Sequence, residues 1–176
     1  MLRWQFERFD DLPIRDWYAA STARVDVFVM EQNCPFQDND GADLFSWHLL
    51  GWDETNGARE LAAYCRIVDA GVKFIEPSIG RVVTPRAFRL QGFGKELMTE
   101  AVRRHGNLYP GRPNRIGAQQ RLEKFYQEFG FETASEMYIE DGIPHVEMLE
   151  GSNRFVIPAE AGIQSIVNQH FVVHEH

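Results

Sequence analysis

The sequence predicts a single α/β domain in which helices flank a sheet of mixed strand direction. Strand-like segments are followed by helical ones through the middle of the chain, which is typical of α/β proteins. Turn-forming residues join strands directly near both ends of the pattern, and these joints predict antiparallel hairpins. The length of 176 residues allows one domain with a full core but not two comfortable ones.

The first strand and the first helix are predicted within the first 31 residues. Residues 2–9 alternate apolar and polar side chains, as in a half-buried strand. Asp10 and Asp11 offer capping groups for a helix that has Pro13 in its first turn and runs to about Glu31. Its apolar face is predicted to comprise Ile14, Trp17, Tyr18, Ser21, Val25, Phe28 and Val29.

A loop is predicted over residues 33–43, which are dense in turn formers. Its carboxylates, Asp38, Asp40 and Asp43, have a spacing that mildly resembles a calcium loop. The glutamate that such a loop needs downstream is absent, so we expect a solvated loop and no metal.

A hairpin follows this loop. Residues 45–52 have strand character, and the turn at 55–57 leads into residues 61–68, which are apolar on both faces. A strand without a polar face belongs in the middle of a sheet, so 61–68 is predicted to be central.

Residues 78–104 carry the strongest functional signal. A strand is predicted over 78–84, where Pro85 ends it, and a helix begins after the sequence Arg-Leu-Gln-Gly-Phe-Gly at 89–94. Glycines let the backbone approach a ligand, and the unpaired N–H groups and dipole of a helix start favour an anion. The order strand, glycine turn, helix therefore predicts a phosphate site, with a purely structural turn as the alternative. The helix buries Phe93, Leu97, Met98, Ala101 and Val102.

The last third of the domain repeats the alternation of strand and helix. A short strand at 115–118 precedes a helix that is capped by Gly130. Two strands, at 131–139 and 144–149, are joined by a hairpin turn at 140–142. The apolar face of the helix comprises Leu122, Phe125, Tyr126 and Phe129.

Charge is distributed unevenly along the chain. The net charge is −8, yet segment 81–124 holds ten basic and three acidic residues. This asymmetry fits an anionic ligand at one end and a cationic one elsewhere, with a plain solvated basic face as the alternative. The acidic total and the lack of a recognised motif argue against a nucleic-acid partner.

The composition also sets the expected compartment. No apolar run approaches the ~20 residues of a membrane span, and the N-terminus lacks an apolar signal core, so we expect a cytoplasmic protein without a membrane partner. Cys34 and Cys65 have no metal-ligand spacing and are expected to be free thiols.

Taken together, several motifs resemble the ElaA-like branch of the GNAT superfamily of acetyltransferases. The glycine turn matches the family's Arg-x-x-Gly-x-Gly pyrophosphate motif, although Leu90 stands where a glycine is often found. The other matching segments are Arg24 to Asp43, His48-Leu49, Tyr64-x-Arg66, Ile79 to Val82, Ala118-Gln119, Phe125 to Phe131 and Glu140 to His145.

This resemblance implies a mixed, strongly twisted sheet with two splayed strands, and a domain spanning 1–150. It implies acetyl-coenzyme A as co-substrate, no metal, and a small-molecule or peptide amine as acceptor. The backbone of Val82 and Val83 would pair with pantetheine, and Arg89, Leu90, Gln91, Gly92, Phe93, Gly94 and Lys95 would hold the pyrophosphate.

Catalytic roles are also carried over from the resemblance. Tyr126 would give a proton to the leaving thiolate, with a core aromatic as the alternative. Glu31 and His48 are candidates for the general base, and Tyr138 and His145 for acceptor binding, with His145 also able to take a proton. Each of these residues can instead have a purely structural role. For His48 the alternative is a core histidine whose hydrogen-bonding needs are met inside the protein.

Two further matters stay open at this point. Residues 151–176 form an accessory tail outside the family pattern, and its apolar residues can dock on the body or on a second copy, which leaves a homodimer as one option. The rival functions are a coenzyme A-binding sensor or structural module without turnover, and an acyl-homoserine-lactone synthase-like acyltransferase.

Overall fold

The computed structural model describes residues 1–151, and the expectations for 152–176 lie outside them. The helices are α1 (Ile14–Arg24), α2 (Phe93–Leu108) and α3 (Glu123–Gln127). The strands are β1 (Arg3–Arg8), β2 (Ser46–Asp53), β3 (Glu60–Val68), β4 (Ser78–Val83), β5 (Asn114–Gln119), β6 (Glu132–Thr133), β7 (Tyr138–Glu140) and β8 (Ile143–Glu150).

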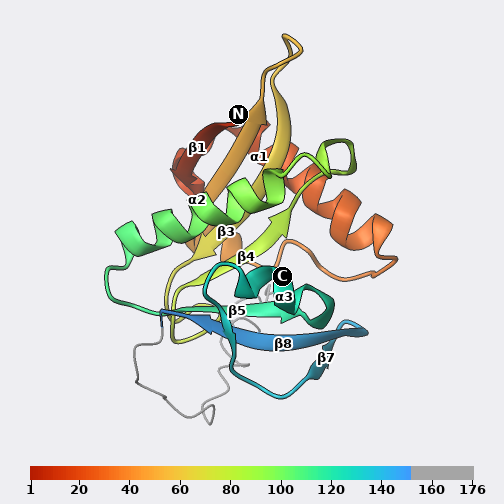
Figure 1. The fold of residues 1–176 in the computed structure, drawn as a ribbon. Coiled ribbons are helices and arrows are strands. Elements are labelled where there is room, and N and C mark those ends of the chain that lie inside the picture. Colours follow the sequence, from red (N-terminus) through yellow and green to blue (C-terminus); the bar gives the residue numbers. More distant parts are fainter. Residues whose placement is uncertain (152–176) are drawn as a thin grey trace, which may run out of the picture.

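These strands form two antiparallel sheets that meet at β4 and β5 (Figure 1). The first sheet has the order β1-β2-β3-β4, and the second has β5-β8-β6 with β7 also pairing with β8. The predicted central strand is confirmed, because β3 lies between β2 and β4 and is buried along most of its length. Both predicted hairpin turns are also present, with positive φ at Gly57 and Gly142.

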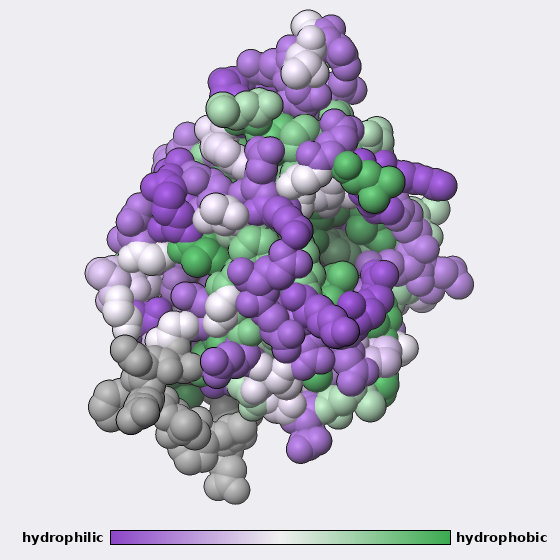
Figure 2. All heavy atoms as spheres, viewed as in Figure 1, coloured by the Kyte–Doolittle hydropathy of each residue, from purple (hydrophilic) through white to green (hydrophobic). Residues whose placement is uncertain are grey.

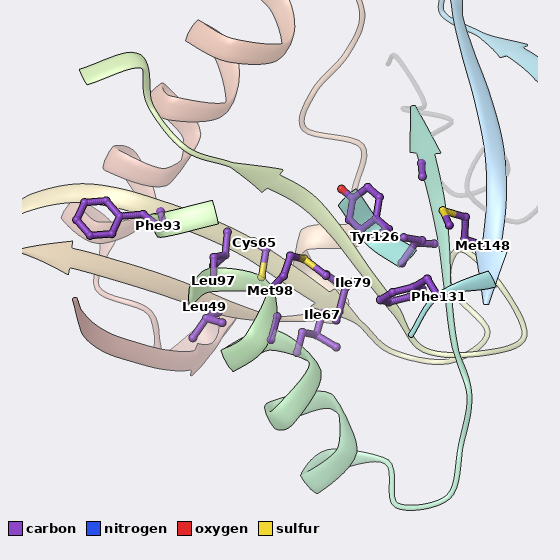
Figure 3. Close-up of a cluster of buried hydrophobic side chains, with 14 of the residues drawn as sticks. Leu49, Cys65, Ile67, Ile79, Phe93, Leu97, Met98, Tyr126, Phe131 and Met148 are labelled. Atoms are coloured by element: carbon purple, nitrogen blue, oxygen red, sulfur yellow. The ribbon is translucent and has the colours of Figure 1, made fainter. Parts of the chain in front are cut away.

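Helices α1 and α2 cover opposite faces of the first sheet, which each present apolar residues because side chains alternate along a strand. On one face, Leu97 and Met98 of α2 pack in a core cluster with Leu49 and Cys65, as Figure 3 shows. On the other face, Ala20 of α1 packs in a second cluster of buried residues. That second cluster also contains Leu12, Leu50, Trp52, Tyr64 and Val83.

The buried face of α1 differs from the predicted one. Ile14 and Tyr18, expected inside, are 82% and 74% exposed, whereas Asp16, Ala20 and Arg24 are buried. No aspartate caps this helix, because Pro13 is its N-cap residue and no side chain bonds to its first turn. Pairing explains the inward charges, since Asp16 is held by Arg59 at 2.7 Å.

Beyond Arg24 the helix continues to Glu31, as predicted, but as a π-helix over Val25–Glu31. This wider winding is rare and frequently occurs at functional sites. The N–H of Cys34 donates to the carbonyl of Val29 at 3.1 Å and closes the end of the segment.

The strand expected over 131–139 is interrupted, because only β6 and β7 pair with β8. The helix before it is shorter than expected but has the predicted glycine cap. Gly130 adopts φ +88°, its N–H donates to Gln127, and the N–H of Phe131 donates to Tyr126. This pair of bonds is the Schellman motif, which ends the helix and ties the carbonyl of Tyr126 to Phe131.

Three arginines and three aspartates form a buried network under the loop before β2. Arg24 donates to Asp38 at 2.9 Å and to Asp43 at 2.7 Å. Arg66 donates to Asp43 at 2.8 Å and to Asp40 at 2.7 Å. The side chains of Arg24 and Arg66 are almost fully buried. The arginine–aspartate network, as we call it, comprises Arg24, Arg66, Arg81, Asp38, Asp40 and Asp43.

The network corrects the prediction of a solvated loop at 33–43. Asp38 and Asp43 are buried, and their charges are balanced by arginines from α1 and β3. Burial by itself raises the pKa of the Asp40 carboxyl, but hydrogen bonds and charge from Arg66 lower it well below its usual range. The loop therefore packs as part of the domain.

The described residues also show the state of the cysteines and the character of the helices. Both cysteines are free thiols, as predicted. Among residues 1–151, no helix combines the length and apolar character that crossing a membrane requires.

Removing one partner of the arginine–aspartate network tests its contribution to stability. We expect Arg24→Leu to lower the free energy of unfolding by about 3–5 kcal/mol, because Asp38 and Asp43 are buried and each loses one of its two arginine partners. The matched control is Arg3→Leu, which breaks the exposed pair with Glu54 and should cost about 1 kcal/mol or less. Urea unfolding measures both, and equal losses in the two variants would contradict the assigned role.

Candidate active site

The site is built around a gap between β4 and β5. The two strands are joined only at their beginnings, where the N–H of Arg115 donates to Pro77 at 3.3 Å and that of Ile79 to the Asn114 side chain at 3.2 Å. Beyond these bonds, no backbone hydrogen bond links the strands in the described chain. The two strands diverge from this junction (Figure 1), so the gap between their backbones lies toward Val83 and Gln119.

A bulge interrupts β4 beyond this junction. The register with β3 shifts between Tyr64 and Arg66, and Arg81 adopts a φ of +52°. Such a φ is uncommon for a residue with a side chain. Arg81 donates to Asp38 at 2.9 Å and to Asp40 at 3.3 Å, so the arginine–aspartate network holds the bulge in place.

The start of α2 lies beside the open end of the gap. Gly92 precedes the helix with φ +85°, and a Cβ there would meet no atom within 4 Å. Lys95 and Glu96 donate their N–H groups to Gly92, but those of Phe93 and Gly94 have no partner among the described residues. Two free N–H groups at a helix start, next to open space, suit an anionic group.

Charged side chains surround this helix start. Arg89 is half-exposed and donates through Nη2 to Glu31 at 2.8 Å, and Lys95 pairs with Glu128 at 2.6 Å. Leu90 is fully exposed with φ +63°, a conformation that the glycine often found at this position would adopt without cost. Figure 2 shows hydrophobic surface at the floor of a hollow in this region, bordered by hydrophilic residues.

Tyr126 belongs to the core cluster that contains Ile79 of β4 and Ala118 of β5. Its ring packs edge-on against Phe131, with ring centroids 6.0 Å apart, and Figure 3 shows its oxygen pointing away from Phe131 and Met148. Its hydroxyl forms no hydrogen bond with the described residues. Burial raises the pKa of this phenol above its usual value, so it stays protonated at neutral pH.

His48 lies inside the first sheet, apart from the gap. Its Nε2–H donates to the Asp43 carbonyl at 3.1 Å, and its Nδ1 accepts from the Tyr64 hydroxyl at 2.8 Å. Burial lowers its pKa to about 4, which keeps the ring neutral. With no exposed surface and both nitrogens engaged, it corresponds to the alternative of a satisfied core histidine.

Tyr138 and His145 lie together near the open end. They pair across β7 and β8, and their rings stack with centroids 5.9 Å apart. His145 donates Nδ1–H to the Ile143 carbonyl at 2.8 Å, which leaves Nε2 as an acceptor. His145 also pairs in register with Gln119, the last residue of β5.

The structure thus brings together most of the predicted site residues and separates one from the rest. The glycine turn, Glu31 and the Tyr138–His145 pair surround one gap, and Tyr126 packs beside it, whereas His48 lies elsewhere. Sequence reasoning gave no role to Gln32 and Gln119, although their side chains hydrogen bond at 3.0 Å. Their only signal was membership of the motifs quoted above.

Comparison with known proteins agrees with this geometry. Residues 56–149 match the family model described as an acetyltransferase (GNAT) domain. Protein ElaA of Escherichia coli is 41% identical over 150 residues, covering 84% of this chain and 95% of that protein. Its crystal structure superposes with a TM-score of 0.77, covering 85% of this chain and 99% of the other.

Two further solved structures share the fold. An acyl-CoA N-acyltransferase from Pseudomonas aeruginosa is 38% identical with a TM-score of 0.78, and covers 85% of this chain and 99% of its own. A Bacillus subtilis acetyltransferase solved in complex with CoA is 16% identical with a TM-score of 0.56, covers 85% of this chain and 98% of its own, and supports the fold alone. This chain therefore belongs to the GNAT family of acyl-CoA N-acyltransferases, in the branch that includes ElaA.

Proposed function

We propose that this protein transfers the acetyl group of acetyl-coenzyme A to a primary amine by direct attack in a ternary complex. One observation carries the proposal: the open end of the gap between β4 and β5 adjoins the unpaired N–H groups at the start of α2. An extended thioester arm fits such a gap, and a pyrophosphate fits such a helix start.

The residues around the gap suit coenzyme A. The unpaired edge of β4 at Val82 and Val83 can bond the amides of the pantetheine arm. The N–H groups of Phe93 and Gly94 can hold the pyrophosphate, with positive charge from Lys95 nearby. Arg89 would contribute by ordering the loop, because its guanidinium is turned toward Thr84 and Glu31. The exposed backbone of Leu90, Gln91 and Gly92 completes the loop.

In the proposed reaction the amine nitrogen attacks the thioester carbonyl carbon. A carbon–nitrogen bond forms, the carbon–sulfur bond breaks, and the thiolate of coenzyme A leaves. Tyr126 donates the proton that the departing sulfur accepts, a role that its protonated and otherwise unengaged hydroxyl supports.

The attacking nitrogen must also lose a proton. Glu31 and His145 are the two candidates that the geometry supports, because a carboxylate oxygen and a free imidazole nitrogen near the open end can accept it, directly or through water. His48 is not included, since its ring has no free nitrogen. Tyr138 would border the acceptor through its stacked ring.

A panel of acceptors tests the proposal. Release of free coenzyme A thiol from acetyl-coenzyme A should accelerate with at least one class among small amines, polyamines, aminoglycosides and peptide amines. Coenzyme A binding without transfer to any of them would instead support the sensor or structural module. Turnover only with S-adenosylmethionine and longer acyl donors would support the lactone-synthase alternative.

The phosphate site is tested by Gly94→Val. This glycine has a helical backbone, and its nearest neighbour to an added Cβ is Thr84 Oγ1 at 3.6 Å, so the fold should tolerate the change. The side chain would occupy the space proposed for pyrophosphate and lower coenzyme A affinity at least ~10-fold, or about 1.4 kcal/mol.

Gly106→Val is the control for Gly94→Val, because it places the same substitution in the same helix, with no atom within 4 Å of its Cβ. Gly92→Val should also block binding, but its φ of +85° adds backbone strain, which makes it the less specific test. Calorimetry that finds equal affinity for folded Gly94→Val and Gly106→Val would refute the assigned phosphate site.

The proton donor is tested by Tyr126→Phe, which keeps the ring and its packing and removes only the hydroxyl. We expect kcat to fall by about 10²-fold or more, with coenzyme A affinity and Tm nearly unchanged. Tyr18→Phe removes an exposed hydroxyl on α1 and should have no effect. A wild-type kcat in Tyr126→Phe would leave Tyr126 as a core aromatic only.

A further inference from the structure

We infer that Glu31 and Gln32 form a strap across the open end of the gap between β4 and β5, and that Gln119 is a positioning residue that fixes the width of the gap through this strap. The inference rests on the proposed function, because it concerns the gap that would receive acetyl-coenzyme A. It assigns roles to Gln32 and Gln119 that no motif argument supplied.

One end of the strap is tied to the β4 side. Glu31 Oε2 accepts from Nη2 of Arg89 at 2.8 Å, and Nε of the same guanidinium donates to the carbonyl of Thr84 at 3.1 Å. Thr84 directly follows β4. Through this single arginine, the end of the π-helix is joined to the end of β4 and to the loop before α2.

The other end of the strap is tied to the β5 side. Gln119 is the last residue of β5, and its Nε2 donates to Oε1 of Gln32 at 3.0 Å. Its Oε1 accepts from Nε of Arg121 at 2.9 Å, so the amide orientation is set by two partners. The adjoining loop is anchored as well, because the Cys34 thiol contacts the Asp141 carbonyl at 3.3 Å in the β7–β8 turn.

Two consecutive residues therefore hold two strands that share no backbone bond at this end. Among the described residues, hydrogen bonds join the two strands only at their beginnings, and Ile79 and Ala118 also share the core with Tyr126. The separation of the strand ends at Thr84 and Gln119 therefore depends on the side chains that span them there. Because the strap makes one contact on the β4 side and one on the β5 side, it favours a single distance between the two strand ends. If binding requires that separation, loss of either contact lowers the fraction of molecules competent to bind.

The experiment compares Gln32→Leu, Gln119→Leu and the double variant. Each single change should weaken coenzyme A binding about five-fold, which is the population change that one net hydrogen bond supports. The KM for acetyl-coenzyme A should rise by a similar factor with kcat within about two-fold, since the reacting groups are untouched. The double variant should match either single one, because both remove the same contact.

Two matched variants make the comparison specific. Gln32→Glu keeps an acceptor oxygen for Gln119 and should retain near wild-type affinity. Gln37→Leu makes the same chemical change at an exposed position of the adjoining loop, where no side-chain hydrogen bond is present among the described residues, and should also behave as wild type.

Calorimetry with coenzyme A separates the possible failures. Wild-type affinity in both single leucine variants, or additive losses in the double variant, would overturn the strap while leaving the proposed function intact. A wild-type protein that does not bind coenzyme A would overturn the proposed function, and the inference with it. Five-fold, non-additive losses with rescue by Gln32→Glu would support the strap.

Discussion

The buried pairing of Arg24, Arg66 and Arg81 with three aspartates is the constraint on which the rest of the site depends. Two of these arginines are almost fully removed from water, so their cost of burial is offset only while every carboxylate stays in place. The network fixes the loop after the π-helix against β3 and β4. It also holds the β4 bulge at Arg81, because the guanidinium is anchored on Asp38.

From this constraint the geometry of the gap follows. The bulge lies in the second half of β4, and the fixed loop follows Glu31 and Gln32, which contact Arg89 in the loop after β4 and Gln119 at the end of β5. The start of α2 lies on the β4 side and the Tyr138–His145 pair on the β5 side. The arginine–aspartate network therefore supports the β4 side of the proposed coenzyme A site, although none of its members needs to touch a reacting atom.

Much of the fold could be predicted because its elements have local signals. The β-branched strand before Pro85, the glycine turn and the apolar face of α2 are all encoded within about thirty residues. The exposure of Ile14 and Tyr18 was missed because buried ion pairs, which depend on distant partners, decided which face of α1 turned inward. Hydrophobic periodicity carries no information about such pairs.

The candidate site likewise combines features that have a local sequence signal with features that have none. The glycine turn and Tyr126 stood in recognisable motifs, so their types and positions could be named in advance. The contacts between Glu31 and Arg89 and between Gln32 and Gln119 join residues that are 58 and 87 positions apart. No local pattern specifies such contacts. His48 matched a family motif, yet only the structure reveals that both of its ring nitrogens are engaged inside the protein.

If coenzyme A binds in the gap and at the start of α2, as we propose, its binding must change the surroundings of the residues there. Amide chemical shifts of the isotope-labelled protein, followed during titration with coenzyme A, report these changes residue by residue. We expect the largest changes at Val82, Val83 and residues 91–95, with the C-terminal half of α2 little affected. Changes confined to other surfaces, or none at saturating coenzyme A, would contradict the proposal.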